Sequence, residues 1–138
     1  MIQWVFYIAK QTVKKIIAAK KNIIESHVLV MGTTFKENVT DIRNSKIADL
    51  VKEFRSFGVT VDIVDPNASS EELMHEYGFG LTEKIGKGYD AVIVAVNHKE
   101  YLPLDETFYS SILSEGGILV DVKGILKNRI KKLSYWSL

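Results

Sequence analysis

Residues 27–46 have the sequence HVLVMGTTFKENVTDIRNSK, and this stretch decides the fold class. An apolar run, residues 27–31, ends at Gly32 and is followed by a loop rich in charged side chains. A compact apolar run that ends in glycine is typical of a buried strand in a parallel sheet. The loop lacks the further glycines of the GxGxxG fingerprint with which dinucleotide-binding folds hold a pyrophosphate. The stretch therefore predicts a nucleotide-type fold whose first loop presents charges instead of glycines.

Strand-like and helix-like segments alternate through the rest of the chain. The expected strands are residues 27–32, 59–66, 89–98 and 117–124, and the expected helices are residues 47–57, 69–78 and 103–117. Residues 78–88 are punctuated by glycine and predict a loop, and the tail, residues 125–138, has no assigned role. This alternation implies right-handed crossovers and a parallel sheet with both faces covered. The sequence thus predicts a Rossmann-like, three-layer α/β fold.

Residues 1–24 are expected to form an amphipathic helix in front of a domain at residues 25–138. The apolar residues that recur at helical spacing are Ile2, Phe6, Ala9, Val13 and Ile16 with Ile17. The apolar part is shorter than the roughly 20 residues of a membrane span, and basic residues follow it, the reverse of a signal peptide. The helix either packs on the domain or offers Trp4 and Phe6 to a partner outside the chain.

Composition narrows the classes of function. The chain has 138 residues and a net charge of +1, so no overall field favours nucleic acid or an anionic membrane. It contains no cysteine, which excludes disulfides, thiolate metal sites and a cysteine nucleophile within this chain. The three histidines do not form a metal-binding pattern along the sequence. We therefore expect no nucleic-acid partner, no membrane, no metal site and no catalytic residue in this chain.

The carboxyl ends of the predicted strands should carry the binding site, because ligands of open parallel sheets bind at that edge. The segments at this edge are Gly32 with its loop, Asp65, Asn97 with His98, and residues 121–124. Asp65 precedes Pro66 and lies farther from Gly32 than the roughly 20 residues expected of a ribose-binding carboxylate. We interpret Asp65 as a turn former and His98 as a hydrogen-bonded residue at a strand end.

Cations gather at this edge. Lys36 and Arg43 lie in the first loop, and a helix is expected to begin near Ser45, so that its N-terminus adds partial positive charge. Lys123, at the end of the last predicted strand, points to the same edge. Such a group favours a phosphate ligand. The alternative is that the acidic residues of the loop simply neutralise Lys36 and Arg43.

The same loop resembles the opening of the UDP-binding domain in the UDP-glucose/GDP-mannose dehydrogenase family. That domain opens with a strand and the pattern G-x-x-FK-x-(N/D)-x-x-D-x-R-(N/E)-S, and the segments Asp65-Pro66, YDAVIVAVNHKEY (residues 89–101) and DVKG (residues 121–124) extend the match. The matching residues are Gly32, Phe35, Lys36, Asn38, Asp41, Arg43, Asn44 and Ser45. The residues of these segments are most similar to those of the branch of UDP-N-acetyl-D-galactosamine/glucosamine 6-dehydrogenases.

The resemblance implies the UDP-sugar-binding, C-terminal part of an NAD-dependent enzyme. Such an enzyme oxidises a UDP-N-acetylhexosamine to the uronic acid used in capsule and O-antigen synthesis. Residues 1–24 would be the end of the helix that links two domains. NAD would be bound mainly by the missing N-terminal domain, which in the family carries the GxGxxG fingerprint and the catalytic cysteine. The full protein would be a cytoplasmic homodimer, and this chain alone would not catalyse oxidation.

The resemblance also implies roles for individual residues. Phe35 and Lys36 match a pair that packs on and hydrogen-bonds the UDP-sugar, and Lys123 stands where many members carry an arginine that contacts it. Lysine keeps that charge but loses the bidentate fork. Arg43 matches an arginine that reaches toward the phosphates of NAD. Two alternatives stay open: a free-standing nucleotide-binding regulatory module without catalysis, and an interaction domain that uses Trp4 and Phe6 with Trp136.

Overall fold

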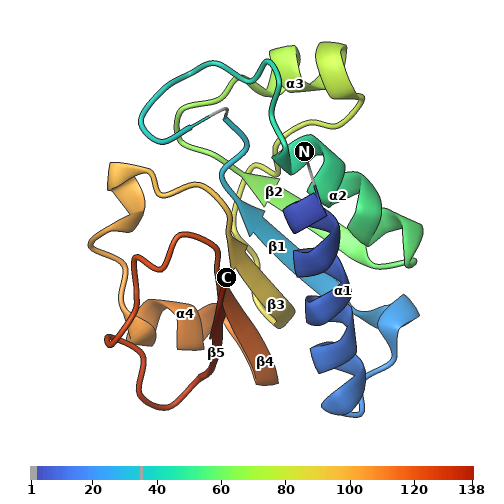
Figure 1. Cartoon of the computed structure of the whole chain (residues 1–138), viewed down its shortest axis with the longest axis vertical. Coiled ribbons are helices and arrows are strands. Elements are labelled where there is room, and N and C mark those ends of the chain that lie inside the picture. Colours follow the sequence, from blue (N-terminus) through green and yellow to red (C-terminus); the bar gives the residue numbers. More distant parts are fainter. Residues whose placement is uncertain (1–2, 35) are drawn as a thin grey trace.

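The computed structural model describes residues 3–34 and 36–138 (Figure 1). In the described part of the chain, five strands form one sheet in the order β2-β1-β3-β4-β5, and every neighbouring pair is parallel. The strands are β1 (His27–Met31), β2 (Thr60–Val64), β3 (Tyr89–Val94), β4 (Leu113–Asp121) and β5 (Ser134–Ser137). This arrangement confirms the predicted α/β fold with a parallel sheet.

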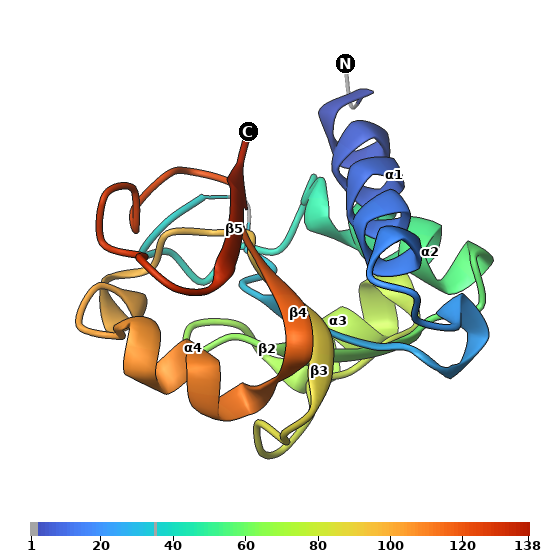
Figure 2. The same cartoon turned by 90° about the horizontal axis from the view of Figure 1, so that it is seen from below.

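Helices cover both faces of the sheet. The α-helices are α1 (Gln3–Ala18), α2 (Ile47–Ser56), α3 (Ser70–Tyr77) and α4 (Glu106–Ile112), and two short 3₁₀ helices are η1 (Ile23–Glu25) and η2 (Lys99–Tyr101). Figure 2 shows α1 and α2 together on one side of the sheet and α4 on the other. The α3 helix lies near the carboxyl edge, beyond the end of β2 (Figure 1). The three layers are as predicted.

Alternation along the strands divides the core between the two faces. Val28 and Val30 of β1 belong to the cluster beneath α1 and α2, whereas Leu29 and Met31 belong to the cluster beneath α4. All four side chains are fully buried. Successive strand residues point to opposite faces, so a strand covered on both sides must be apolar throughout. The continuous apolar run in the sequence therefore has a direct physical cause.

The α1 helix presents a different stripe from the predicted one. Ala9, Val13 and Ile16 are buried as expected, and Val5, Ile8 and Thr12 complete the buried face. Phe6 and Ile17, in contrast, are 41% and 55% exposed. The inward face is therefore rotated relative to the predicted stripe, and it packs with α2 and the sheet in one core cluster. Ile2 lies outside the described residues, and the division of the chain at residue 24 stays a prediction.

The predicted boundary between the last helix and strand is wrong. The helix was expected to run to residue 117, but α4 ends at Ile112 and β4 begins at Leu113. Gly117 explains the difference, because a Cβ there would lie 2.9 Å from the carbonyl oxygen of Tyr89. The backbone of Gly117 thus lies directly against β3, where a helix could not come so near. A register shift between Tyr89 and Ala91 accompanies this approach.

The tail of unassigned role forms β5, which pairs in parallel with β4. The Tyr135 hydroxyl donates a 2.6 Å hydrogen bond to the Asp121 carboxylate, and the Trp136 ring lies 6.0 Å from the ring of Tyr7. The tail therefore supplies the outer strand of the sheet next to β4. No helix in the described residues is long and apolar enough to span a bilayer.

Candidate functional site

Strand order places a crevice between β1 and β3. The chain leaves β1 toward β2 on one side and leaves β3 toward β4 on the other, so the loops that follow the two strands diverge. Open parallel sheets bind ligands at this switch point, beyond the carboxyl ends of the strands. The two loops meet at Gly32, where the φ angle is +102° and a Cβ would lie 2.6 Å from the Cβ of Val96. Only glycine allows both this angle and this approach.

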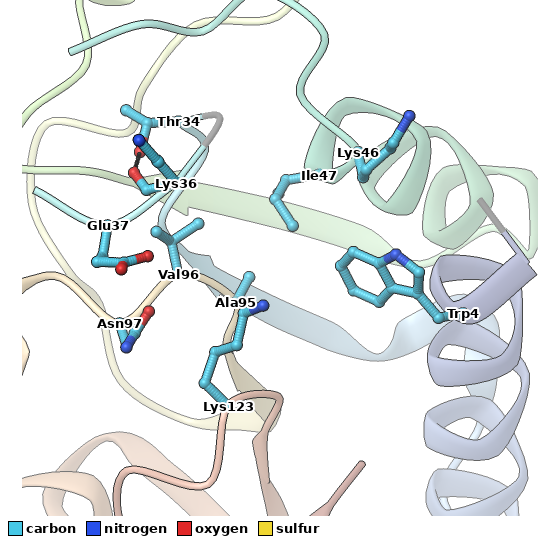
Figure 3. A pocket seen from close by; sticks show the side chains of 10 residues that line it. All are labelled: Trp4, Thr34, Lys36, Glu37, Lys46, Ile47, Ala95, Val96, Asn97 and Lys123. Carbon is cyan, nitrogen blue, oxygen red and sulfur yellow. Dashed lines mark hydrogen bonds between the residues drawn. The ribbon is translucent and has the colours of Figure 1, made fainter. Parts of the chain in front are cut away.

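A small cavity of about 80 Å³ lies in this crevice (Figure 3). Five segments contribute to it: α1, the loop from β1 to α2, the start of α2, the loop after β3, and the turn after β4. The residues that line it are Trp4, Thr34, Lys36, Glu37, Lys46, Ile47, Ala95, Val96, Asn97 and Lys123. Lys36 and Lys123, which are far apart in the sequence, thus flank one cavity at the predicted edge.

The charge balance of the cavity is positive. Three of its residues are lysines, and Glu37 is the single acid among them. In the part of the chain that the structure describes, none of the three lysines forms an ion pair. In Figure 3, Lys123 extends between the two sides of the cavity, whereas the amine of Lys46 points away from it. An unpaired cationic crevice of this kind suits an anion, and phosphate above all.

Arg43 is not part of this cavity. Its guanidinium binds Asp41 of the same loop in a two-pronged contact, with nitrogen–oxygen distances of 3.0 and 3.2 Å. The Arg43 side chain is 79% exposed. The hydrogen bonds from Arg43 lower the pKa of Asp41, and the contact raises the pKa of Arg43 in return. Neutralisation within the loop therefore applies to Arg43 and not to Lys36, while Phe35 lies outside the described residues.

Asp65 and His98 form a buried pair beneath the loop that carries Lys36. The His98 Nε2 atom lies 3.1 Å from the Asp65 carboxylate, and both side chains are 0% exposed. The carboxylate also accepts hydrogen bonds from the backbone N–H groups of Asn67 and Ala68, which confirms Asp65 as a turn former. Burial by itself would raise the pKa of Asp65, but the hydrogen bonds that it accepts outweigh burial and lower that pKa.

Lys46, Asn97 and Trp4 are cavity residues that the sequence analysis did not assign to the site. Lys46 directly precedes α2, so its place at a helix start was a usable signal. Asn97 was placed at the correct edge but given no role, and its Oδ1 atom is buried without a partner among the described residues. Trp4 comes from a helix on the far side of the cavity, and no local pattern predicts that approach.

A second, larger groove of about 830 Å³ lies on the α4 face. It is lined mostly by apolar side chains, and its charged residues are Asp65, Glu83 and Glu100. No lysine or arginine of the described residues lines it, so the groove does not suit a phosphate. The described residues also contain no cluster of three His, Cys, Asp or Glu side chains that could hold a metal ion. The cationic cavity is therefore the better candidate for the binding site.

Comparisons with known proteins identify the family. Residues 29–128 match the model of the UDP-glucose/GDP-mannose dehydrogenase family, UDP binding domain. The chain is 38% identical to a UDP-N-acetyl-D-glucosamine 6-dehydrogenase of Salmonella typhi, over 87% of this chain and 28% of that protein. It is 32% identical to Protein CapL of Staphylococcus aureus, over 88% of this chain and 29% of that protein.

A solved structure shares the fold. The UDP-D-ManNAc dehydrogenase from Pyrococcus horikoshii superimposes with a TM-score of 0.74 at 21% identity, over 96% of this chain and 30% of that one. The chain spans less than a third of the length of the curated relatives it matches. Its matching region includes most of β1, the charged loop and the turn after β4. The chain therefore belongs to the UDP-glucose/GDP-mannose dehydrogenase family, of which it represents the UDP-binding domain.

Proposed function

We propose that the cationic cavity binds the diphosphate of a UDP-sugar, as part of a longer NAD-dependent nucleotide-sugar 6-dehydrogenase. The observation that carries this proposal is that Lys36 and Lys123 line the same cavity at the switch point of the sheet. The family match supports UDP as the nucleotide, and the dehydrogenase relatives favour this function over a free-standing regulatory module.

Each lysine has a defined role in this proposal. Lys36 and Lys123 approach the diphosphate from opposite sides, and each supplies a mobile ammonium group with three donors. Lys46 adds long-range attraction, because its amine points out of the cavity. Phe35 packs against the UDP-sugar, a role inferred from its place in the family pattern. The buried, unpartnered Oδ1 of Asn97 accepts a hydrogen bond from an N–H or O–H group of the ligand.

The oxidation itself is assigned to another part of the longer enzyme. This chain contains no cysteine, so it cannot supply the nucleophile that forms a thioester. NAD is bound mainly outside this chain, and Arg43 contributes to NAD binding by reaching toward its phosphates. Arg43 must first leave Asp41, which is possible because the pair is exposed and such pairs are weak.

The substrate is proposed to be a UDP-N-acetylhexosamine. The relatives in Salmonella typhi and Pseudomonas aeruginosa are named UDP-N-acetyl-D-glucosamine 6-dehydrogenases, which supports an N-acetylated sugar. The product would be the uronic acid that serves surface polysaccharide synthesis, including capsule and O-antigen. We further propose that residues 1–24 end the interdomain helix, and that the full enzyme is a cytoplasmic homodimer.

Calorimetric titration of UDP tests the site directly. We expect Lys36→Ala and Lys123→Ala each to weaken UDP binding by about tenfold, because each removes a charge-assisted contact with the diphosphate. Lys87→Ala is the matched control, since Lys87 is exposed in the loop that leads into the amino end of β3. Uridine should bind all four proteins equally weakly. Equal UDP affinity in both cavity variants and the control would contradict the proposed site.

A further inference from the structure

We propose that His98 is a positioning residue: with Asp65, it locks the loop of Lys36 in the conformation that receives a diphosphate. The hydrogen bonds by which His98 and Asp65 hold this loop are called the lock. Its value for UDP binding rests on the proposed function, but the lock itself exists in the protein without a ligand. The lock and the proposed function can therefore be tested separately.

Hydrogen bonds define the state of the His98 ring. Its Nδ1 atom accepts a 2.9 Å hydrogen bond from the backbone N–H of Asn38. An imidazole nitrogen that accepts a hydrogen bond carries no proton, so the proton of the neutral ring resides on Nε2. That Nε2–H faces the Asp65 carboxylate at 3.1 Å. One neutral tautomer thus joins the charged loop to the end of β2.

Asp65 anchors this tautomer to the sheet. Its Oδ2 atom accepts hydrogen bonds from the Thr33 N–H at 2.6 Å and from the Thr33 hydroxyl at 3.1 Å, in addition to His98. Its Oδ1 atom accepts from the turn that follows β2. A buried carboxylate with this many donors is rigidly held. Asp65 therefore ties together the carboxyl ends of β1, β2 and β3.

The network holds Lys36 from both sides. On one side, the Thr34 hydroxyl donates a 2.7 Å hydrogen bond to the Lys36 carbonyl, and its oxygen lies 3.3 Å from His98 Nε2. On the other side, Asn38 has a φ angle of +60°, and its Oδ1 accepts a 2.7 Å hydrogen bond from the Lys99 N–H. Because the backbone is held in advance, binding need not order it, which strengthens affinity.

These contacts distinguish the lock from ordinary core packing. A histidine that only filled space would need no particular tautomer, whereas His98 donates at Nε2 and accepts at Nδ1 toward two different segments. The acceptor at Nδ1 binds the backbone of the loop of Lys36 directly, whereas Nε2 lies nearer to the Asp65 carboxylate, at 3.1 Å, than to the Thr34 hydroxyl, at 3.3 Å. Removing the acceptor should therefore loosen the loop more than removing the donor.

Two substitutions separate these functions. In His98→Asn the side-chain oxygen can take the place of Nδ1 and accept from Asn38, whereas in His98→Gln the side-chain nitrogen can take the place of Nε2 and donate to Asp65. Each variant loses one hydrogen bond, so they are matched controls for each other. We expect the Asn38 amide to exchange with solvent about fivefold faster in His98→Gln than in His98→Asn, the effect of about one hydrogen bond. Ligand-free protein is used for this measurement.

UDP affinity provides the functional readout. We expect His98→Gln to bind UDP about fivefold more weakly than His98→Asn, since only the latter keeps the loop ordered. Equal amide exchange in the two variants would overturn the lock. Failure of the wild-type protein to bind UDP would overturn the proposed function, while the exchange rates would still decide the lock.

The wild-type ring gives a test that needs no substitution. Nitrogen-15 spectroscopy should show His98 protonated at Nε2 and unprotonated at Nδ1, with a slowly exchanging Asn38 amide. The opposite tautomer would overturn the inference even if both variants failed to fold.

Discussion

The amino and carboxyl ends of the parallel strands, here called the amino edge and the carboxyl edge, use lysine in opposite ways. At the amino edge, Lys21 binds Asp90 at 2.9 Å, and Ser114 donates to the same carboxylate. At the carboxyl edge, Lys36 and Lys123 form no ion pair among the described residues. Lys21, which is paired, stabilises the fold, whereas Lys36 and Lys123 leave positive charge for a ligand. A lysine count from the sequence cannot separate these two uses.

The histidines repeat the contrast. His27 lies 3.0 Å from Asp62 at the amino edge, where the two side chains are 36% and 23% exposed. His98 meets Asp65 at the carboxyl edge with both side chains 0% exposed. Solvent can replace the first contact when it breaks, but it cannot reach the second. The carboxyl edge therefore combines exposed lysines with a buried, hydrogen-bonded support.

The largest expected effect is the loss of that support. Asp65→Ala should lower the free energy of unfolding by about 3–5 kcal/mol, because it leaves several buried hydrogen-bond donors without an acceptor. Asp90→Ala should lower the same free energy by only about 1–2 kcal/mol. Urea denaturation of both variants measures the difference. Equal losses would remove the distinction between the two edges.

Acid should destabilise the protein through Asp65 at the carboxyl edge and through Asp90 at the amino edge in the same direction. The folded-state pKa values of Asp65 and Asp90 lie below the usual 3.8, so the stability that they provide is present above the unfolded value. It is lost as the pH falls through the depressed folded values. Below about pH 5 the free energy of unfolding should therefore decline, and more gently in Asp65→Asn and Asp90→Asn than in the wild type. Parallel curves for all three proteins would show that neither carboxylate contributes.

The smallest expected effect sharpens the role of Lys123. Lys123→Arg should tighten UDP binding by about two- to fivefold, because a guanidinium can bind a phosphate with two parallel hydrogen bonds. Calorimetry at fixed ionic strength measures the change. Lys87→Arg serves as the control, and a similar gain there would point to unspecific attraction.

Much of the fold was predictable because its signals are local. Both faces of β1 are covered, so its residues had to be apolar, and the start of α3 was marked by Ser69, which accepts a hydrogen bond from the Glu72 N–H. The errors arose where distant segments intervene. The α4 boundary depends on the contact of Gly117 with β3, and the exposed position of Phe6 depends on how α1 lies against α2.

The candidate site was predictable to a similar degree. Parallel strands end at a common edge, so Lys36 and Lys123 could be assigned to it from the sequence alone. Lys46 was missed although its place directly before α2 was a usable signal, whereas Trp4 was missed because its approach depends on helix packing. The separation of Arg43 from the cavity was equally hidden, since the sequence could not show that Asp41 pairs with Arg43 while Lys36 forms no ion pair within the described part of the chain.

The sequence by itself determined the succession of the helices and of the first four strands along the chain, the edge at which a ligand is expected to bind, and the cations available there. These follow from periodicity and from the geometry of parallel sheets, which act within short segments. Only the tertiary structure decided which cations are neutralised and which residues support the loop. That outcome depends on distances between atoms far apart in the chain, as between His98 and Asn38, and burial then makes such contacts strong.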